Sequence, residues 1–236
     1  MSTFDFNTVV SQFIKALPAS GLAKFLEITA NNPNIVPLSV GEPDFDIPAK
    51  VKEACIDSIN AGKSTYTSTL GLLELREAIA DDTYKNYGVK YDPKTEIMVT
   101  VGVSEALYVV VRSILAPGDE IIIPEPCYVA NKACIILSGA KPIPVETFLE
   151  NNFVPTIEDL EKAVTPKTKA ILLGYPNNPT GAIISKEQIK QIGDWAKKHN
   201  LVIVSDELYA HLTYGGKKHT MFTSYSEFRD RTFVLY

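Results

Sequence analysis

The feature that most constrains the fold is an alternation of short apolar runs with helical patterns, which begins near Glu96 and continues to the last residues. Continuous apolar runs of this kind are typical of strands that are buried on both faces of a sheet. The expected strands are residues 97–100, 120–123, 141–145, 170–173, 201–204 and 232–235. Helical patterns lie between them at residues 105–115, 128–137, 157–164 and 186–199. This alternation of strands and helices predicts an α/β fold with a doubly wound, mostly parallel sheet.

The part of the chain before Glu96 lacks this alternation of strands and helices. It contains an N-terminal helical stretch, a loop rich in proline and aspartate at residues 41–48, and helical patterns near residues 51–60 and 72–87. We therefore expect residues 1–48 to form an arm and residues 49–236 to form the large domain. Because the last expected strand ends at Tyr236 without a polar tail or a closing helix, we expect this domain to be incomplete at its C-terminus.

Composition excludes several classes of protein. Of the 236 residues, 45% are hydrophobic and 22% are charged, which is typical of a globular protein and not of a disordered one. The net charge of −5 gives no reason to expect nucleic acid or an anionic membrane as a partner, so a small molecule is the better expectation. The N-terminus lacks a secretory signal and no apolar run reaches spanning length, which predicts a cytoplasmic protein.

The cysteines indicate neither a disulfide framework nor a metal site. Cys55, Cys127 and Cys134 are too few and too irregularly spaced for either. We expect them to be small buried hydrophobic residues, and we expect no bound metal.

Ligands of open parallel sheets bind at the carboxyl ends of the strands, so the residues that follow each expected strand are the candidates for a site. After residues 97–100, Gly102 loosens the chain and a helix begins near Ser104, where free N–H groups and the helix dipole favour a phosphate. The alternative is an ordinary strand-to-helix turn in which Ser104 is only the N-cap.

Aromatic and amide side chains follow two further strands. Tyr128 comes after two prolines at the start of a helix, where its ring can stack on a planar ligand or can be an ordinary core tyrosine. Asn178 lies in the turn 174–181, which is dense in proline, asparagine and glycine. Its neutral amide can donate to a phenolate, or the segment can be a turn without a ligand.

An acidic residue leaves the buried strand at residues 201–204. Asp206 needs a partner at such a place, because a buried carboxylate without one is costly. It either caps the following turn or faces a cationic ligand group such as a protonated pyridine nitrogen. Tyr209 follows three positions later.

Together these blocks resemble the class I and II aminotransferases, which have the large-domain fold of the fold-type I pyridoxal-phosphate enzymes. Gly41-Glu-Pro-Asp-Phe45 is similar to the substrate loop of that family, and Tyr66 with residues 71–76 is similar to its lead-in. Residues 178–181 and 205–209 are similar to its two most diagnostic blocks. The match runs nearly from end to end of the chain, in the order and spacing of the family.

The resemblance implies pyridoxal 5′-phosphate as the cofactor, bound by residues 49–236, and a role for each candidate residue. Val103 and Ser104 would hold the phosphate, and Tyr128 would stack on the pyridine ring. Asp206 would pair with the protonated ring nitrogen, which keeps the ring able to accept electrons released at the substrate Cα.

The same resemblance implies the substrates and a partner. Asn178 and Tyr209 would donate to the phenolate oxygen of the cofactor, and Gly41 would lie with Asn178 at the substrate carboxylate. Tyr66 would reach the phosphate of a neighbouring subunit in a homodimer, unless it is a loop tyrosine that packs locally. The implied reaction passes an amino group from an amino acid to a 2-oxo acid.

One part of the family pattern is not found in these residues. The resemblance places the lysine that links covalently to the cofactor just beyond Tyr236, and it places the second half of the substrate pocket in a C-terminal domain. Lys217 and Lys218 follow two glycines in a polar loop and are expected to be solvated charges. We therefore expect the chain of 236 residues to be inactive or nearly so.

Three alternatives to amino-group transfer follow from the same residues. Lyases that act at Cβ or Cγ use the same fold and cofactor, and a truncated domain can bind the cofactor without catalysis. A nicotinamide dehydrogenase is disfavoured, because no Gly-x-Gly-x-x-Gly follows the early strands. The uncharged Ser104 offers no added cation for a second substrate carboxylate, so aromatic, aspartate-like and alanine-like donors all stay open.

Overall fold

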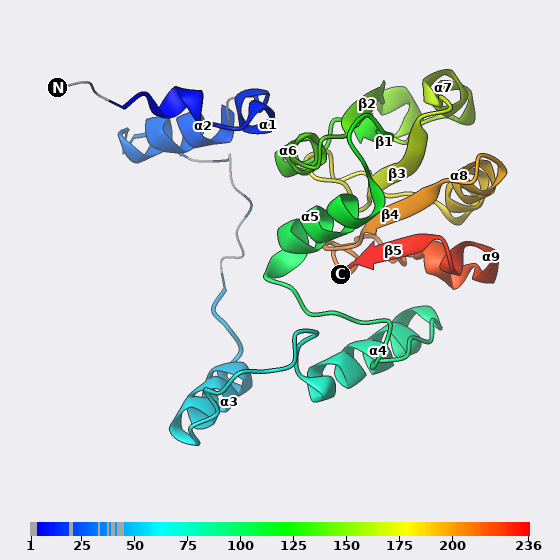
Figure 1. Ribbon diagram of the computed structural model, residues 1–236. Helices are drawn as coiled ribbons and strands as arrows, with labels where there is room; N and C mark the ends of the chain where they lie inside the picture. Colours follow the sequence, from blue (N-terminus) through cyan, green and yellow to red (C-terminus); the bar gives the residue numbers. More distant parts are fainter. Residues whose placement is uncertain (1–3, 19–20, 33, 37, 39–40, 42–44) are drawn as a thin grey trace.

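A five-stranded parallel sheet, with helices around it, is formed by the C-terminal part of the chain (Figure 1). The structure is a computed structural model that describes residues 4–18, 21–32, 34–36, 38, 41 and 45–236. The strands are β1 Glu120–Glu125, β2 Lys141–Glu146, β3 Thr168–Gly174, β4 Val202–Asp206 and β5 Thr232–Leu235. Their order in the sheet is β2-β1-β3-β4-β5, so the α/β fold predicted from the apolar runs is confirmed.

Helices cover both faces of this sheet. On β3, Ala170 and Leu172 pack into a cluster with α5 and α6, whereas Ile171 and Leu173 pack into a second cluster with α7, α8 and α9. The bounds of these helices are α5 Gly102–Ile114, α6 Val129–Leu137, α7 Ile157–Ala163, α8 Lys186–Lys198 and α9 Ser226–Arg229. Short 3-10 turns are η2 Leu149–Asn151 and η3 Phe222–Ser224. The doubly wound arrangement is therefore confirmed, with element ends within a few residues of those predicted.

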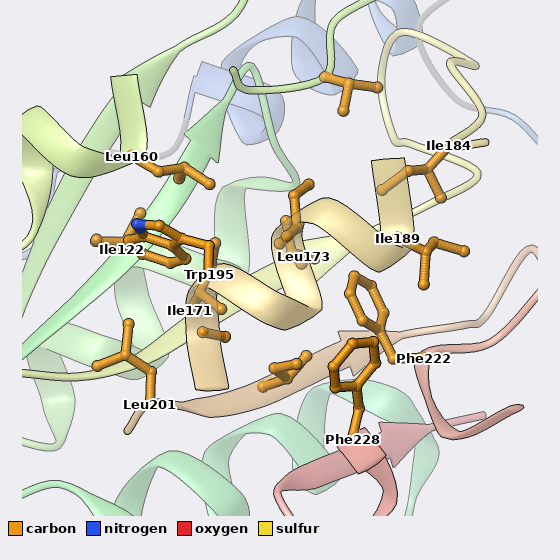
Figure 2. Packing of buried hydrophobic residues seen from close by; sticks show 14 of the residues in the cluster. Ile122, Leu160, Ile171, Leu173, Ile184, Ile189, Trp195, Leu201, Phe222 and Phe228 are labelled. Atoms are coloured by element: carbon orange, nitrogen blue, oxygen red, sulfur yellow. The ribbon is translucent and has the colours of Figure 1, made fainter. Parts of the chain in front are cut away.

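The cluster between β3 and α8 contains the largest buried side chains (Figure 2). Trp195 and Ile189 of α8 and Phe228 of α9 all belong to this cluster. Helix α8 passes so close to the Phe228 ring that Gly193 is needed there: an added Cβ would lie 2.3 Å from Phe228 Cε2. Backbone and ring are thus in direct contact at this point.

The N-terminal elements lie outside the sheet. They are η1 Phe6–Thr8, α1 Gln12–Lys15, α2 Gly21–Ala30, α3 Ala49–Asn60 and α4 Leu73–Tyr87. Figure 1 shows α3 well apart from the strands, and none of its side chains is buried. The division into an arm of residues 1–48 and a large domain of residues 49–236 stays a prediction. No helix among the described residues is long and apolar enough to cross a membrane.

The predicted strand at residues 97–100 is wrong. This segment pairs with no strand of the described sheet, and its Val99 N–H donates to Leu70 O at 3.0 Å. It packs on a glycine, since a Cβ added to Gly71 would lie 2.7 Å from Val99 Cβ. An apolar run sets the tendency to be extended, but a strand also needs a neighbour to bond with, and the local pattern does not supply one.

Candidate active site

A pocket lies at the carboxyl ends of three adjacent strands. The order β1-β3-β4 brings together the turns that follow these strands, with Gly174 beside Asp206 in the register of β3 and β4. The residues that line the pocket are Pro124, Cys127, Tyr128, Asn131, Leu172, Gly174, Tyr175, Pro176, Asn177, Asn178, Asp206 and Tyr209. Four of the predicted site residues, Tyr128, Asn178, Asp206 and Tyr209, are therefore neighbours in space.

Asp206 is the last residue of β4 and is partly buried. Its Oδ1 accepts from Leu208 N at 3.1 Å, and this is its only side-chain hydrogen bond with the described residues. Burial raises the pKa of the Asp206 carboxyl, the bond from Leu208 lowers it, and the negative charge of Glu207 raises it further. Asp206 thus caps the following turn and also faces the pocket with acceptor capacity left for a cationic group.

Tyr128 is the N-cap residue of α6, and its side chain is not in the core. It is 39% exposed and contributes its ring to the pocket wall, so the alternative of an ordinary core tyrosine is wrong. Tyr209 lies in the turn after β4, held by a bond from Leu212 N to Tyr209 O at 2.8 Å. An aromatic face and a phenol therefore border the same pocket as the Asp206 carboxylate.

Asn177 and Asn178, in the turn after β3, differ in their hydrogen bonds. Asn177 holds the turn together, because its Oδ1 accepts from Thr180 Oγ1 at 2.8 Å and its Nδ2 donates to Gly174 O at 3.3 Å. The neighbouring Asn178 makes no side-chain hydrogen bond within the described part of the chain and lines the pocket. Its amide is therefore free to donate to a ligand.

The other predicted residues are not among those that line the pocket. Val103 packs against the cluster under α5, and Ser104 is exposed in the first turn of that helix. The N-cap is Val101, so the alternative that made Ser104 the N-cap is wrong. Tyr66 is fully exposed, which excludes local packing in the described structure, and Gly41 is exposed with open space where a Cβ would be.

Cys127 and Asn131 line the pocket but were not predicted as site residues. Both belong to the segment that carries Tyr128, so the position after β1 was the signal that could have found them. Burial raises the pKa of the Cys127 thiol, and the charge of Glu125 raises it further. The expectation of three buried cysteines is correct for Cys134 but wrong for Cys55, which is exposed, and for Cys127, which is half-buried.

The lysines of the described chain lie elsewhere. Lys217 and Lys218 are exposed, as predicted, and border a separate groove together with the first residues of α8. None of the described residues that line the pocket at the strand ends is a lysine. In the described part of the chain, no three histidine, cysteine, aspartate or glutamate side chains are grouped so that they could hold a metal ion.

Comparison with known proteins is consistent with this geometry. Residues 33–234 match the family described as aminotransferase class I and II. The chain is 41% identical over 226 residues to the putative aminotransferase YugH of Bacillus subtilis, covering 96% of this chain and 58% of that protein. It is 37% identical to aromatic-amino-acid aminotransferase 2 of Thermococcus litoralis, again covering 96% of this chain and 58% of the relative.

The fold of the chain is also similar to that of a solved aminotransferase structure. The aspartate aminotransferase of Thermus thermophilus with maleate superposes with a TM-score of 0.88 at 37% identity. The superposition covers 95% of this chain and 59% of that one. The chain thus spans less than two thirds of the length of the proteins that it matches.

Proposed function

The chain belongs to the class I and II aminotransferases, and from this premise we propose that the whole protein transfers an amino group from an amino acid to a 2-oxo acid. The family generally depends on pyridoxal 5′-phosphate, and we propose the same cofactor here. One observation carries the proposal: Tyr128, Asn178, Asp206 and Tyr209, expected from three separate strand ends, line a single pocket.

The donor and acceptor groups of the pocket fit the cofactor. Asp206 is a partly buried carboxylate with one hydrogen bond and a raised pKa, so a protonated pyridine nitrogen would supply the cation that it lacks. The half-exposed ring of Tyr128 would stack on the pyridine face. The Asn178 amide and the Tyr209 hydroxyl would donate to the phenolate oxygen.

The remaining site residues would complete the binding of cofactor and substrate. Val103 and Ser104 lie in the first turn of α5, a helix of 13 residues whose N-terminal N–H groups suit a phosphate. Tyr66 is fully exposed, which supports a role in a second subunit's site and hence a homodimer. Gly41 would leave room for the substrate carboxylate, because it is exposed and none of the described residues lies where its side chain would be.

The chemistry is divided between the bound group and the protein. When bound, pyridoxal phosphate accepts the electron pair released as the bond between substrate Cα and hydrogen breaks. Asp206 would hold a proton on the ring nitrogen, which would preserve the positive charge that attracts the electrons. Asn178 and Tyr209 would hold the ring in the pocket by hydrogen bonds to its oxygen. We propose that the lysine that forms the covalent link lies outside residues 1–236, since none of the described lysine side chains borders the pocket.

Borohydride labelling of the protein from its source tests this function. We expect a pyridoxyl label on a lysine outside residues 1–236, together with conversion of the cofactor to its pyridoxamine form after an amino acid is added. A lyase would give elimination products without stable pyridoxamine. A label on a lysine within residues 1–236 would refute the proposed place of the link, and no label at all would refute the function.

Thiol alkylation of the chain tests ligand binding in the pocket. Pyridoxamine 5′-phosphate is a suitable probe because it has no aldehyde to react with surface lysines. We expect it to slow the alkylation of Cys127 about tenfold or more at saturation, since it would cover that wall of the pocket. Peptide mass spectrometry measures each cysteine separately, and the exposed Cys55 is the internal control that should not change.

The rate of this reaction should also depend on pH in a defined direction. Because the thiolate is the reactive form, the raised pKa of Cys127 shifts its alkylation to higher pH than for an ordinary thiol. Equal protection of Cys55 and Cys127 would mean that the probe acts elsewhere, and no protection of Cys127 would contradict ligand binding at this pocket.

A further inference from the structure

Directly after Asp206 the chain buries an acidic side chain against a histidine. The side chains of Glu207 and His219 are 2% and 4% exposed, and Glu207 Oε2 is hydrogen-bonded to His219 Nε2. The other carboxylate oxygen, Glu207 Oε1, accepts from Ser205 Oγ at 2.7 Å. Both oxygens are thus satisfied, as a buried carboxylate requires.

Glu207 is also fixed through its backbone. Its N–H donates to Leu235 O of β5 at 2.7 Å, and its carbonyl accepts from Ala210 N at 2.9 Å. The second of these bonds closes the turn that carries Tyr209. Glu207 does not line the pocket, whereas Asp206 and Tyr209 on either side of it do. Glu207 and its hydrogen bonds therefore fix the segment outside the pocket, while Asp206 and Tyr209 of the same segment line the pocket.

His219 is held in turn by an aromatic ring. Tyr87, the last residue of α4, meets it edge to face with ring centroids 6.0 Å apart. The titratable groups around Glu207 are Asp206, His219, Tyr87 and Tyr91. Burial raises the pKa of Asp206, and the negative charge of Glu207 adds to this effect, so Glu207 also makes Asp206 a better proton acceptor.

We propose that Glu207 and His219 are a positioning pair, which aims the Asp206 carboxylate at the ring nitrogen of the bound cofactor and supplies the negative charge behind it. This inference rests on the proposed function. Neither residue touches the pocket, so both act through Asp206. A protein that merely needed a filled core at this place could use apolar side chains instead.

The test is the affinity of the chain for pyridoxamine 5′-phosphate in variants of the pair. His219→Leu removes the donor to Glu207, and we expect the dissociation constant to rise about tenfold. His219→Gln keeps a donor, and we expect it to restore most of the affinity. The matched control is His199→Leu, because the partly buried His199 pairs with Glu161 at 3.0 Å near the start of β4, at the opposite end of the strands.

A second readout reports on the charge of Glu207. Absorption of the bound probe shows whether its ring nitrogen is protonated, and we expect the ring to lose this proton at a lower pH in Glu207→Gln than in the parent chain. A purely structural role would leave that pH unchanged. An unchanged value refutes the electrostatic part of the proposal, and this variant also serves if His219→Leu does not fold.

Combination with Asp206→Asn separates the inference from the proposed function. If the pair acts through Asp206, His219→Leu should not weaken binding further once Asp206 has been replaced by asparagine. If the loss is the same in both backgrounds, or absent in the parent, the positioning role is refuted. If Asp206→Asn alone leaves the affinity unchanged, the proposed function fails instead.

Discussion

Replacing Asp206 with asparagine is expected to weaken the binding of pyridoxamine 5′-phosphate about 100-fold or more. The loss of one partner of a buried ion pair costs about 3–5 kcal/mol, and each 1.4 kcal/mol is about tenfold in affinity. The substituted asparagine would keep the shape of the side chain but not the charge that holds a proton on the ring nitrogen. Isothermal titration of the chain measures the effect directly.

The matched control for this substitution is Asp194→Asn. Asp194 lies on the outer face of α8 and pairs with Lys190 at 2.7 Å, away from the pocket. Its removal should leave the affinity unchanged. A loss of less than about fivefold in Asp206→Asn would contradict the assigned ion pair, because an exposed charge pair alone contributes up to about 1 kcal/mol.

The same substitution should change the pH dependence of stability without ligand. Because burial raises the pKa of Asp206 in the folded chain, the folded state binds this proton more tightly than the unfolded state. The resulting stabilisation is present at low pH and is lost as pH rises through the raised pKa. Urea unfolding from about pH 4 to neutrality should therefore show Asp206→Asn gaining stability relative to the parent as pH rises.

The second large effect concerns the core between the sheet and α8. Phe228→Ala is expected to lower the free energy of unfolding by about 3–5 kcal/mol, the range for truncating a buried aromatic ring. Phe228 is fully buried and lies in the cluster of Figure 2. Part of its wall is the backbone of α8 at Gly193, which cannot move in to fill the space, so the upper part of the range applies.

Chemical denaturation of the chain measures this effect, with Phe148→Ala as the control. Phe148 is an exposed phenylalanine, so its truncation should change the unfolding free energy by less than about 0.5 kcal/mol. Similar losses in the two variants would show that the buried cluster is not the source of stability assigned to it.

The sequence determined most of the regular structure. Apart from Glu120, the runs at residues 120–123, 170–173 and 201–204 are apolar at successive positions because both faces of a central parallel strand are buried, and each run overlaps a strand of the structure. The start of α8 is equally local, since Ser185 and Gln188 form a capping box there. Such features depend on neighbours in the chain, so residue order alone predicts them.

Part of the site followed from the same reasoning. Parallel strands end at a common edge, so Tyr128, Asn178, Asp206 and Tyr209 could be expected to meet as soon as the strands were assigned. Sequence did not show that Asn177 is used to hold its own turn while Asn178 is free.

Tertiary structure alone decided the rest. The segment at residues 97–100 has the composition of a strand, but a strand exists only where another backbone offers its N–H and C=O groups. His219 meets Glu207 across a loop of 11 residues that carries no periodic signal. Propensity and periodicity are properties of adjacent residues, whereas pairing, burial and the partners of a charge depend on segments that only folding brings together.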